Sequence, residues 1–250
     1  MNIIIHGSTG RMGKILCDLL TAGYPGLTLA ARVSPEEISD PAACVYTSLN
    51  EVTCQVDGVI DFSHHTAVGG LMDFCMAKNL PVVVATTGHT PEEKALIFAA
   101  AEEIPVFYAG NVSLGIAVLC RLVKQAAAFF PDADIEIVET LNSQQADAPG
   151  ATAMMLYNVI KEVRPQAWPN SGRSGEIKRT PEEVGIHSLR MGSLAGIHEV
   201  HIHAGSQCLT LKHEAASQDS LAEGAAAAAR FMLGKGRGLY DMESLLNEKQ

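Results

Sequence analysis

The sequence predicts an α/β protein of two domains, a parallel sheet flanked by helices and then a smaller α+β domain. Strand-like and helix-like segments alternate through the first half of the 250 residues. Such alternation is typical of a parallel sheet with helices on both faces. A glycine-rich loop follows the first strand, and from about residue 113 the alternation gives way to long helices and consecutive strands. These three observations define the expected architecture.

Five apolar segments of the first half are predicted strands, at residues 2–6, 27–33, 58–62, 81–85 and 106–108. Helices are expected between them, through residues 14–20, over 67–77 and from Pro91 to about Ala101. The last of these has a clear start signal, because Thr90 is a favourable N-cap and a proline at the first helical position is pre-organised for a helix.

The second domain is expected at residues 113–218, with helices over 114–129 and 153–163 and strands at 135–138, 185–190, 198–204 and 208–213. Residues 165–181 are rich in Pro, Gly, Ser and Arg, which predicts a mobile loop. The alanine-rich run 215–233 predicts a closing helix that ends at Gly234 and returns to the first domain. The first domain therefore comprises residues 1–112 and 219–250.

Composition excludes several classes of protein. The chain is 47% hydrophobic, carries a net charge of −10 and shows no basic patch, which argues against a nucleic-acid partner. No apolar run approaches the roughly 20 residues of a membrane helix, and no signal peptide precedes the first strand. The six cysteines are scattered without CxxC spacing, as expected of free thiols in a reducing compartment. We expect a cytoplasmic protein without membrane partners.

The segment NIIIHGSTGRMG at residues 2–13 carries the strongest functional signal. A buried strand enters a loop with Gly7, Gly10 and Gly13 and continues as a helix, so backbone N–H groups at the helix start lack partners. Together with the helix dipole, these groups favour a phosphate. The glycines allow a tight turn, close approach of a pyrophosphate and close packing of helix on strand. We expect a dinucleotide cofactor; the alternative is a tight turn without a ligand.

The end of the second strand bears on which dinucleotide binds. A carboxylate at this place selects NAD through the ribose 2′-hydroxyl, but here the chain reads Arg32-Val33-Ser34 with no acid before Glu36. A hydroxyl with Arg32 or Arg11 nearby suits a 2′-phosphate. The sequence therefore predicts NADPH, with NADH as the alternative.

Two loops at the carboxyl ends of later strands, residues 61–65 and 85–88, are expected to hold the nicotinamide ribose and amide. The first of them contains His64 and His65. Either imidazole is a candidate for proton transfer, but adjacent side chains point in different directions. Neither histidine is assigned a catalytic role from the sequence.

Seven short segments carry a family resemblance: residues 7–13, 61–62, 86–88, 111–115, 147–149, 185–188 and 238–242. Together they resemble the dihydrodipicolinate reductase family, the 4-hydroxy-tetrahydrodipicolinate reductases of lysine and diaminopimelate synthesis, over essentially the whole chain. The resemblance implies an N-terminal Rossmann domain and a mixed-sheet substrate domain that also builds a homotetramer. It further implies hydride delivery from NAD(P)H to a cyclic unsaturated imine. The residues expected to bind the cofactor are Gly7, Gly10, Arg11, Met12, Gly13, Ser34, Phe62, Ala85, Thr87, Gly88 and Asn111.

The chain departs from the family's signature E-x-H-H-x-x-K-x-D-A-P-S-G-T, because residues 139–152 read ETLNSQQADAPGAT. The resemblance implies that the two histidines and the lysine serve proton transfer and binding of the substrate carboxylate. It also implies that the Ser-Gly-Thr turn binds a carboxylate. Leu141 and Asn142 stand at the histidine positions, and Gln145 stands at the lysine position. A family arginine is replaced by Gln218. The scaffold matches, whereas the substrate chemistry differs.

This departure predicts a different substrate. A charge-assisted hydrogen bond contributes about 1.5–3 kcal/mol, so loss of two cations weakens dicarboxylate binding by roughly two to four powers of ten. We expect a substrate with at most one charge, reduced at a C=N or conjugated C=C bond. Asn142 and Gln145 are the expected catalytic residues, and the expected substrate-binding residues are Gln144, Gly150, Ala151 and Thr152. The alternative is a non-catalytic NAD(P)H-binding homologue that acts as a regulatory or sensor subunit.

Glu199, His201 and His203 alternate along one predicted strand, so their side chains share a face. These residue types are able to bind zinc. We favour a polar stripe at a subunit interface over a metal site and predict no metal.

Overall fold

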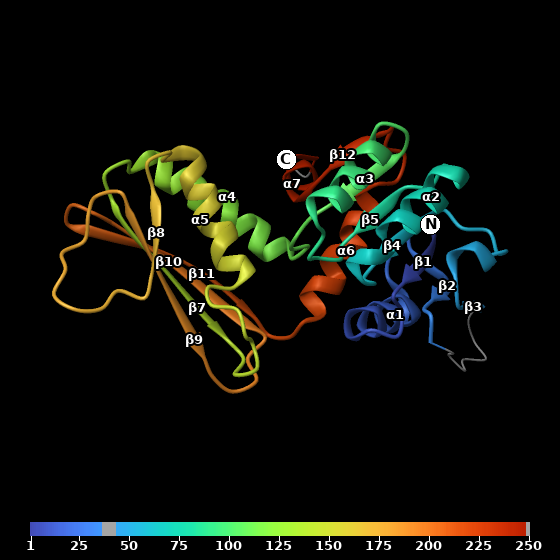
Figure 1. Ribbon diagram of the computed structural model, residues 1–250, viewed down its shortest axis with the longest axis horizontal. Coiled ribbons are helices and arrows are strands. Elements are labelled where there is room, and N and C mark those ends of the chain that lie inside the picture. Colours follow the sequence, from blue (N-terminus) through green and yellow to red (C-terminus); the bar gives the residue numbers. More distant parts are fainter. Residues whose placement is uncertain (37–43, 249–250) are drawn as a thin grey trace. The chain divides into compact units, whose positions relative to one another are not determined.

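The computed structural model describes residues 1–36 and 44–248, which form two compact units (Figure 1). Unit 1 comprises Met1–Leu114 and the C-terminal segment from Asp219, and unit 2 comprises Gly115–Gln218. No helix among the described residues is both long and apolar enough to cross a membrane. All six cysteines are free thiols.

Unit 1 contains a seven-stranded sheet in the order β12-β6-β5-β4-β1-β2-β3, with every neighbouring pair parallel. Its strands are β1 (Asn2–His6), β2 (Thr28–Val33), β3 (Cys44–Tyr46), β4 (Gly58–Asp61), β5 (Val82–Val84), β6 (Pro105–Tyr108) and β12 (Gly238–Tyr240). The central strands are buried on both faces, which explains their unbroken Ile and Val runs. The chain order reverses between β1 and β4, and ligands of such sheets bind beyond the carboxyl ends of strands at this point.

Five helices belong to unit 1: α1 (Arg11–Gly23), α2 (Val68–Lys78), α3 (Pro91–Ala101), α6 (Asp219–Phe231) and α7 (Met242–Glu248), with short 3-10 turns η1 (Leu49–Glu51) and η2 (His65–Ala67). The predicted N-cap of α3 is confirmed, since the Thr90 hydroxyl accepts a hydrogen bond from the Glu93 N–H at 3.2 Å. Helix α6 packs against α1, β4 and β5. Gly224 of α6 also allows close approach to the segment before α4 (Leu114–Phe129), because a Cβ there would lie 1.8 Å from the Val112 carbonyl oxygen.

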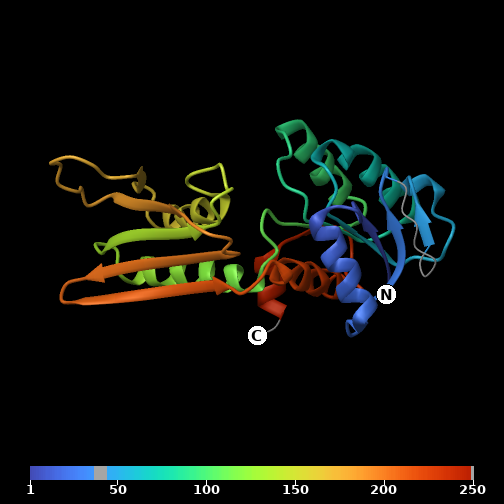
Figure 2. The same ribbon diagram turned by 90° about the horizontal axis from the view of Figure 1, so that it is seen from below.

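Unit 2 contains a five-stranded mixed sheet in the order β11-β10-β7-β9-β8. Its strands are β7 (Asp134–Leu141), β8 (Trp168–Ser171), β9 (Glu183–Arg190), β10 (Gly196–Ala204) and β11 (Gln207–Ala215). The helices α4 (Leu114–Phe129) and α5 (Ala151–Val163) cover one face, where Ile135, Ile137 and Ile202 are buried beneath them (Figure 2). Strand β7 lies at the centre, antiparallel to β10 and parallel to β9.

Three sequence predictions need correction. The expected loop 165–181 contains β8, an edge strand paired with β9; its Pro169 and Asn170 are poor strand formers, and proline is tolerated at an edge. The expected closing helix begins at Asp219 rather than at residue 215, because β11 extends to Ala215. The short elements β3, β12 and α7 were not predicted, since segments of so few residues carry little periodicity.

Candidate functional site

Two glycines of the first loop are required because neighbouring backbone atoms leave no room for a Cβ. Gly7 has φ +82°, and a Cβ there would lie 2.5 Å from the Phe62 carbonyl oxygen. A Cβ at Gly13 would lie 2.1 Å from the Gly7 carbonyl oxygen. Gly10 is the N-cap of α1, and this helix start has neither a side-chain cap nor an acidic residue in its first turn. The loop thus presents backbone N–H groups and the positive end of a helix dipole.

A buried carboxylate connects the carboxyl ends of β1, β4 and β5. Asp61, the last residue of β4, is 1% exposed. Its Oδ1 accepts a hydrogen bond from Ser63 Oγ at 2.6 Å and lies 2.8 Å from His6 Nδ1, and its Oδ2 accepts one from Thr86 Oγ1 at 2.6 Å. Sequence reasoning did not single out Asp61, although an acid at the end of an apolar buried strand was the available signal.

A cavity of about 480 Å³ lies over these strand ends. Its walls come from Arg11, Met12, Phe62, Ser63, His64, His65, Ala85, Thr86, Thr87, Gly110, Asn111, Val112 and Leu221. Six residues predicted for the cofactor are therefore brought together in one hollow. Gly7, Gly10, Gly13, Ser34 and Gly88 are not among its walls.

Ser34 is 2% exposed and belongs to the packing of the glycine loop. Its Oγ lies 2.5 Å from Thr9 Oγ1, and the Gly7 N–H donates to the Val33 carbonyl at 2.8 Å. The end of β2 is thus tied directly to the glycine loop.

The two adjacent histidines of the cavity wall have different partners. His65 Nδ1 lies 2.9 and 2.8 Å from the two carboxylate oxygens of Glu93, whereas His64 Nδ1 lies 2.9 Å from Thr66 Oγ1. The Thr90 N–H holds the pKa of Glu93 below its usual range, and the hydrogen bond from His65 acts in the same direction. Only His65 is therefore paired with a carboxylate.

In unit 2 the predicted substrate residues follow β7. Asn142 Oδ1 accepts the Gln144 N–H at 3.0 Å, the Asn142 carbonyl accepts the Gln145 N–H at 3.2 Å, and the Gln145 side-chain amide donates to Asp147. The structure thus brings Asn142, Gln144 and Gln145 together in one turn. Gly150, Ala151 and Thr152 instead form the start of α5, which has no side-chain cap.

A second buried carboxylate holds this substrate loop. Glu139 is fully buried, and its Oε1 accepts hydrogen bonds from Gly150 N at 2.9 Å, Ser188 Oγ at 2.7 Å and Arg190 Nη2 at 2.7 Å. Arg190 also donates to the carbonyl oxygens of Gln145 and Asp147. Sequence reasoning missed Ser188 and Arg190, because nothing in a local pattern indicates that β9 lies beside β7.

His198 lies close to the same carboxylate. It is 5% exposed, and its Nε2 is 4.0 Å from Glu139 Oε2. Burial lowers the pKa of His198 to about 4, although the charge of Glu139 opposes this shift. The imidazole is therefore neutral at physiological pH.

Two of the three candidate metal residues of β10, Glu199 and His201, are engaged in polar pairs, and His203 is exposed. His201 lies 3.6 Å from Glu199 and 3.1 Å from Thr210 Oγ1, and Lys212 lies 3.5 Å from Glu199. Within residues 1–36 and 44–248, no three His, Cys, Asp or Glu side chains are grouped to hold a metal ion.

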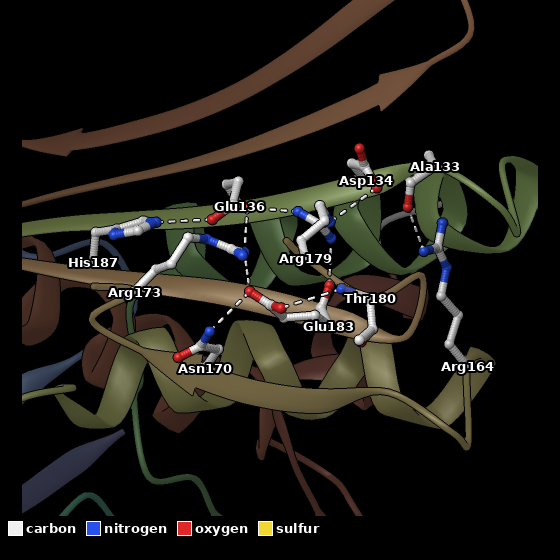
Figure 3. Close-up of polar contacts among 10 residues, drawn as sticks. All are labelled: Ala133, Asp134, Glu136, Arg164, Asn170, Arg173, Arg179, Thr180, Glu183 and His187. Atoms are coloured by element: carbon white, nitrogen blue, oxygen red, sulfur yellow. Dashed lines mark hydrogen bonds and ion pairs between the residues drawn. The ribbon is translucent and has the colours of Figure 1, made fainter. Parts of the chain in front are cut away.

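The sheet face of unit 2 away from α4 and α5 carries a charged network (Figure 3). Glu136 pairs with Arg179 at 2.5 Å and with His187 at 2.8 Å, and Arg179 also pairs with Asp134 at 3.0 Å. A Cβ at Gly185 would lie 1.7 Å from Glu136 Oε2, so this glycine leaves room for the carboxylate.

Both parts of the chain match models of one protein family. Residues 1–112 match "Dihydrodipicolinate reductase, N-terminus", and residues 115–246 match "Dihydrodipicolinate reductase, C-terminus". The chain belongs to the dihydrodipicolinate reductase family. This family consists of NAD(P)H-dependent oxidoreductases, so the predicted fold class and enzyme class are confirmed.

Relatives support the assignment over the full length. The chain is 38% identical over 250 residues to the 4-hydroxy-tetrahydrodipicolinate reductase of Caldanaerobacter subterraneus subsp. tengcongensis, covering 99% of each chain. It is 38% identical over 248 residues to the enzyme of the same name from Exiguobacterium sp., covering 99% of this chain and 96% of the other. Its fold resembles the dipicolinate-bound dihydrodipicolinate reductase of Paenisporosarcina sp. TG-14, with a TM-score of 0.79 and 23% identity over 96% of this chain and 97% of that one.

Proposed function

We propose that this protein reduces a C=N or conjugated C=C bond of a small molecule that carries at most one carboxylate. One observation carries the proposal. The loop between β7 and α5 is held by Glu139 and Arg190, yet the end of β7 and this loop carry the neutral side chains Leu141, Asn142 and Gln145 where the signature has histidines and lysine.

The residues of unit 1 fit a pyridine dinucleotide, which supplies a hydride when bound. Gly7 and Gly13 leave a cradle without Cβ atoms at the start of α1, and this cradle suits the pyrophosphate. Phe62, Ala85, Thr87, Gly88 and Asn111 are the proposed contacts of the nicotinamide and its ribose. NADPH is the proposed coenzyme, because the end of β2 lacks an acid.

Arg11 is the proposed partner of the 2′-phosphate, whereas Ser34 is 2% exposed and its hydroxyl lies 2.5 Å from Thr9 Oγ1. Arg11 is exposed at the first position of α1 and lines the cavity.

The start of α5 suits a single substrate carboxylate. Its helix dipole and the backbone N–H of Ala151 favour an anion, while the Gly150 N–H already binds Glu139. Arg190 is engaged by Glu139 and so is not offered to a second carboxylate. Asn142 and Gln145 are the proposed hydrogen-bonding partners of the reacting group.

We also propose a cytoplasmic homotetramer assembled through the sheet face that α4 and α5 leave uncovered. This face combines the charged network of Glu136 with exposed apolar side chains such as Leu189, which is 46% exposed. Light scattering after gel filtration is expected to give about four times the chain mass of 26.5 kDa. A monomeric mass would contradict the assembly.

The test of the function is nucleotide oxidation with a panel of cyclic imines. Monocarboxylates such as pyrroline-2-carboxylate are expected to exceed the dicarboxylate 4-hydroxy-tetrahydrodipicolinate in kcat/KM by about 100-fold or more. Gln145→Lys is expected to narrow this gap by restoring a cation. A preference of the wild type for the dicarboxylate would overturn the proposed selectivity. Tight nucleotide binding without any turnover would instead indicate a sensor subunit.

A further inference from the structure

The substrate loop lacks imidazoles at the two places where the family signature has them, since Leu141 and Asn142 stand there. Reduction of a C=N bond nevertheless requires a proton for the nitrogen. A side chain poised to give a proton near neutral pH is usually histidine. The cavity of unit 1 contains two, His64 and His65.

We propose that His65, oriented by Glu93, is the proton donor of the reductase, an inference that rests on the proposed function. His65 begins the η2 turn directly after β4 and lines the cavity. Its side chain is 29% exposed, so the ring is largely shielded but reaches the hollow. Nδ1 is bound by Glu93, and within residues 1–36 and 44–248 no group hydrogen-bonds Nε2. Nε2 is therefore the nitrogen that remains to exchange a proton.

The Glu93 carboxylate is itself fixed in place. It belongs to the capping box of α3, where its Oε2 accepts the Thr90 N–H at 2.8 Å. The same hydrogen bond keeps the carboxyl group ionised, because it holds the pKa of Glu93 below its usual range. An ionised carboxylate at Nδ1 fixes the orientation of the ring.

None of the other charged or titratable groups around His65 and Glu93 is proposed as the proton donor. His64 comes from the same turn, His89 from the loop after β5, and Arg11 from the start of α1. His89 is 7% exposed, and burial lowers its pKa, which favours its neutral form. Beyond them, Lys94 and Asp61 act on His89 through their charges.

As the carbon of the C=N bond takes the hydride supplied by NAD(P)H, the nitrogen receives the π electron pair and takes the proton from Nε2 of His65. The C=N bond becomes a CH–NH bond, and the coenzyme leaves as NAD(P)⁺. His65 is left as a neutral imidazole bound to Glu93 and regains a proton from water.

His64 provides a matched control. It lines the same cavity, and its ring centroid lies 4.3 Å from that of His65. Its Nδ1 is bound to the Thr66 hydroxyl instead of a carboxylate. Glu93→Gln is the second informative variant, because glutamine retains the capping box while removing the charge.

The first experiment needs no substrate. Calorimetric titration of NADP⁺ near pH 6.5 in buffers of different ionisation enthalpy measures the proton release that accompanies binding. The positive nicotinamide ring disfavours a nearby imidazolium, so the wild type and His64→Gln are expected to release a fraction of a proton. His65→Gln is expected to release clearly less. Equal release from His65→Gln and the wild type would overturn the placement of His65 beside the reacting ring.

The second experiment compares pH profiles of kcat with the best substrate of the imine panel. His65→Gln is expected to lower kcat by about 10²–10⁴-fold, with the Kd for NADPH changed by less than about threefold. Glu93→Gln is expected to lower kcat less and to move the alkaline limb of the profile to lower pH. His64→Gln is expected to leave the alkaline limb at its wild-type pH, whatever its effect on the height of the profile. Melting temperatures of all variants exclude unfolding as the cause.

The outcomes separate the two hypotheses. Retention of kcat by His65→Gln, or loss of the alkaline limb in His64→Gln, would overturn the donor role and leave the proposed function intact. Nucleotide binding by a wild type that reduces no compound of the panel would overturn both.

Discussion

Asp61 in unit 1 and Glu139 in unit 2 are both buried carboxylates in central strands, but their partners differ. Asp61 is bound by the hydroxyls of Ser63 and Thr86 and by His6, so both of its oxygens have partners. Glu139 receives three donors on Oε1, including the guanidinium of Arg190, whereas Oε2 has no hydrogen bond among the described residues.

The two carboxylates therefore stabilise their surroundings in different ways. At the nucleotide end, short bonds join the ends of three parallel strands, and the glycine loop packs against them. In unit 2, the ion pair of Glu139 with Arg190 holds the loop between β7 and α5. A buried ion pair is strongly destabilised when one partner is lost. The substrate loop should therefore be sensitive to charge, and the nucleotide end should be sensitive to steric fit.

The largest expected effect is at the glycine loop. Gly13→Ala would place a Cβ 2.1 Å from the Gly7 carbonyl oxygen, and relief requires movement of α1 or β1. We expect the free energy of unfolding to fall by more than about 3 kcal/mol and nucleotide affinity to fall at least about 100-fold. Calorimetry and urea unfolding measure both quantities.

Gly70→Ala is the control for this prediction, since nothing lies within 4 Å of its would-be Cβ in α2. It is expected to change stability by less than about 1 kcal/mol, in the stabilising direction. If Gly13→Ala behaved like Gly70→Ala, the close approach of α1 to the loop would not be needed for binding.

Glu139→Gln tests the ion pair. We expect the free energy of unfolding to fall by about 3 kcal/mol, because Arg190 loses its buried counter-charge. The double variant Glu139→Leu/Arg190→Met should be less destabilised than the sum of its two single changes. Urea unfolding of the wild type, Glu139→Leu, Arg190→Met and the double variant measures the coupling between the two side chains. If the two single effects simply added, the pair would not be coupled.

The pH dependence of stability tests the environment of His198. The folded protein does not protonate this ring until pH falls to about 4, whereas the unfolded chain binds the proton below about pH 6.5. Stability is therefore present above pH 6.5 and is lost as pH falls towards 4. At pH 5 the loss is on the order of 2 kcal/mol.

His198→Gln should lose this contribution to the pH dependence. The difference between the wild type and this variant isolates His198 from the half-buried His213, whose pKa partial burial also lowers. Urea unfolding at pH 7.5 and pH 5 measures it. Parallel pH curves for the two proteins would contradict the assigned burial.

The smallest expected effects come from removing one hydroxyl donor from each of the two buried carboxylates. Thr86→Val removes the donor to Asp61 Oδ2, for which the described residues offer no second hydrogen bond, so we expect a loss of about 2 kcal/mol. Ser188→Ala leaves Glu139 Oε1 with two further donors, and we expect about 1 kcal/mol. If urea unfolding showed that Ser188→Ala loses as much stability as Thr86→Val, or more, this difference between the two carboxylates would be contradicted.

Much of the fold follows from local patterns. The strand and helix around Gly7, Gly10 and Gly13 are predictable because the turn is made by neighbouring residues. The same holds for α3, whose Thr90 cap and Glu93 lie three residues apart. The edge strand β8 is not predictable in this way, because its Trp168–Ser171 segment is extended through pairing with β9.

The residues of the candidate site also differ in whether they can be predicted from the sequence. The absence of histidine and lysine from residues 139–152 can be seen from the order of residues alone. Only the tertiary structure showed that Ser188 and Arg190 reach Glu139 from 49 and 51 residues away. It likewise brought Glu93 to His65 across 28 residues. Hydrogen bonding and burial depend on proximity in space, and the arrangement of strands and helices creates that proximity.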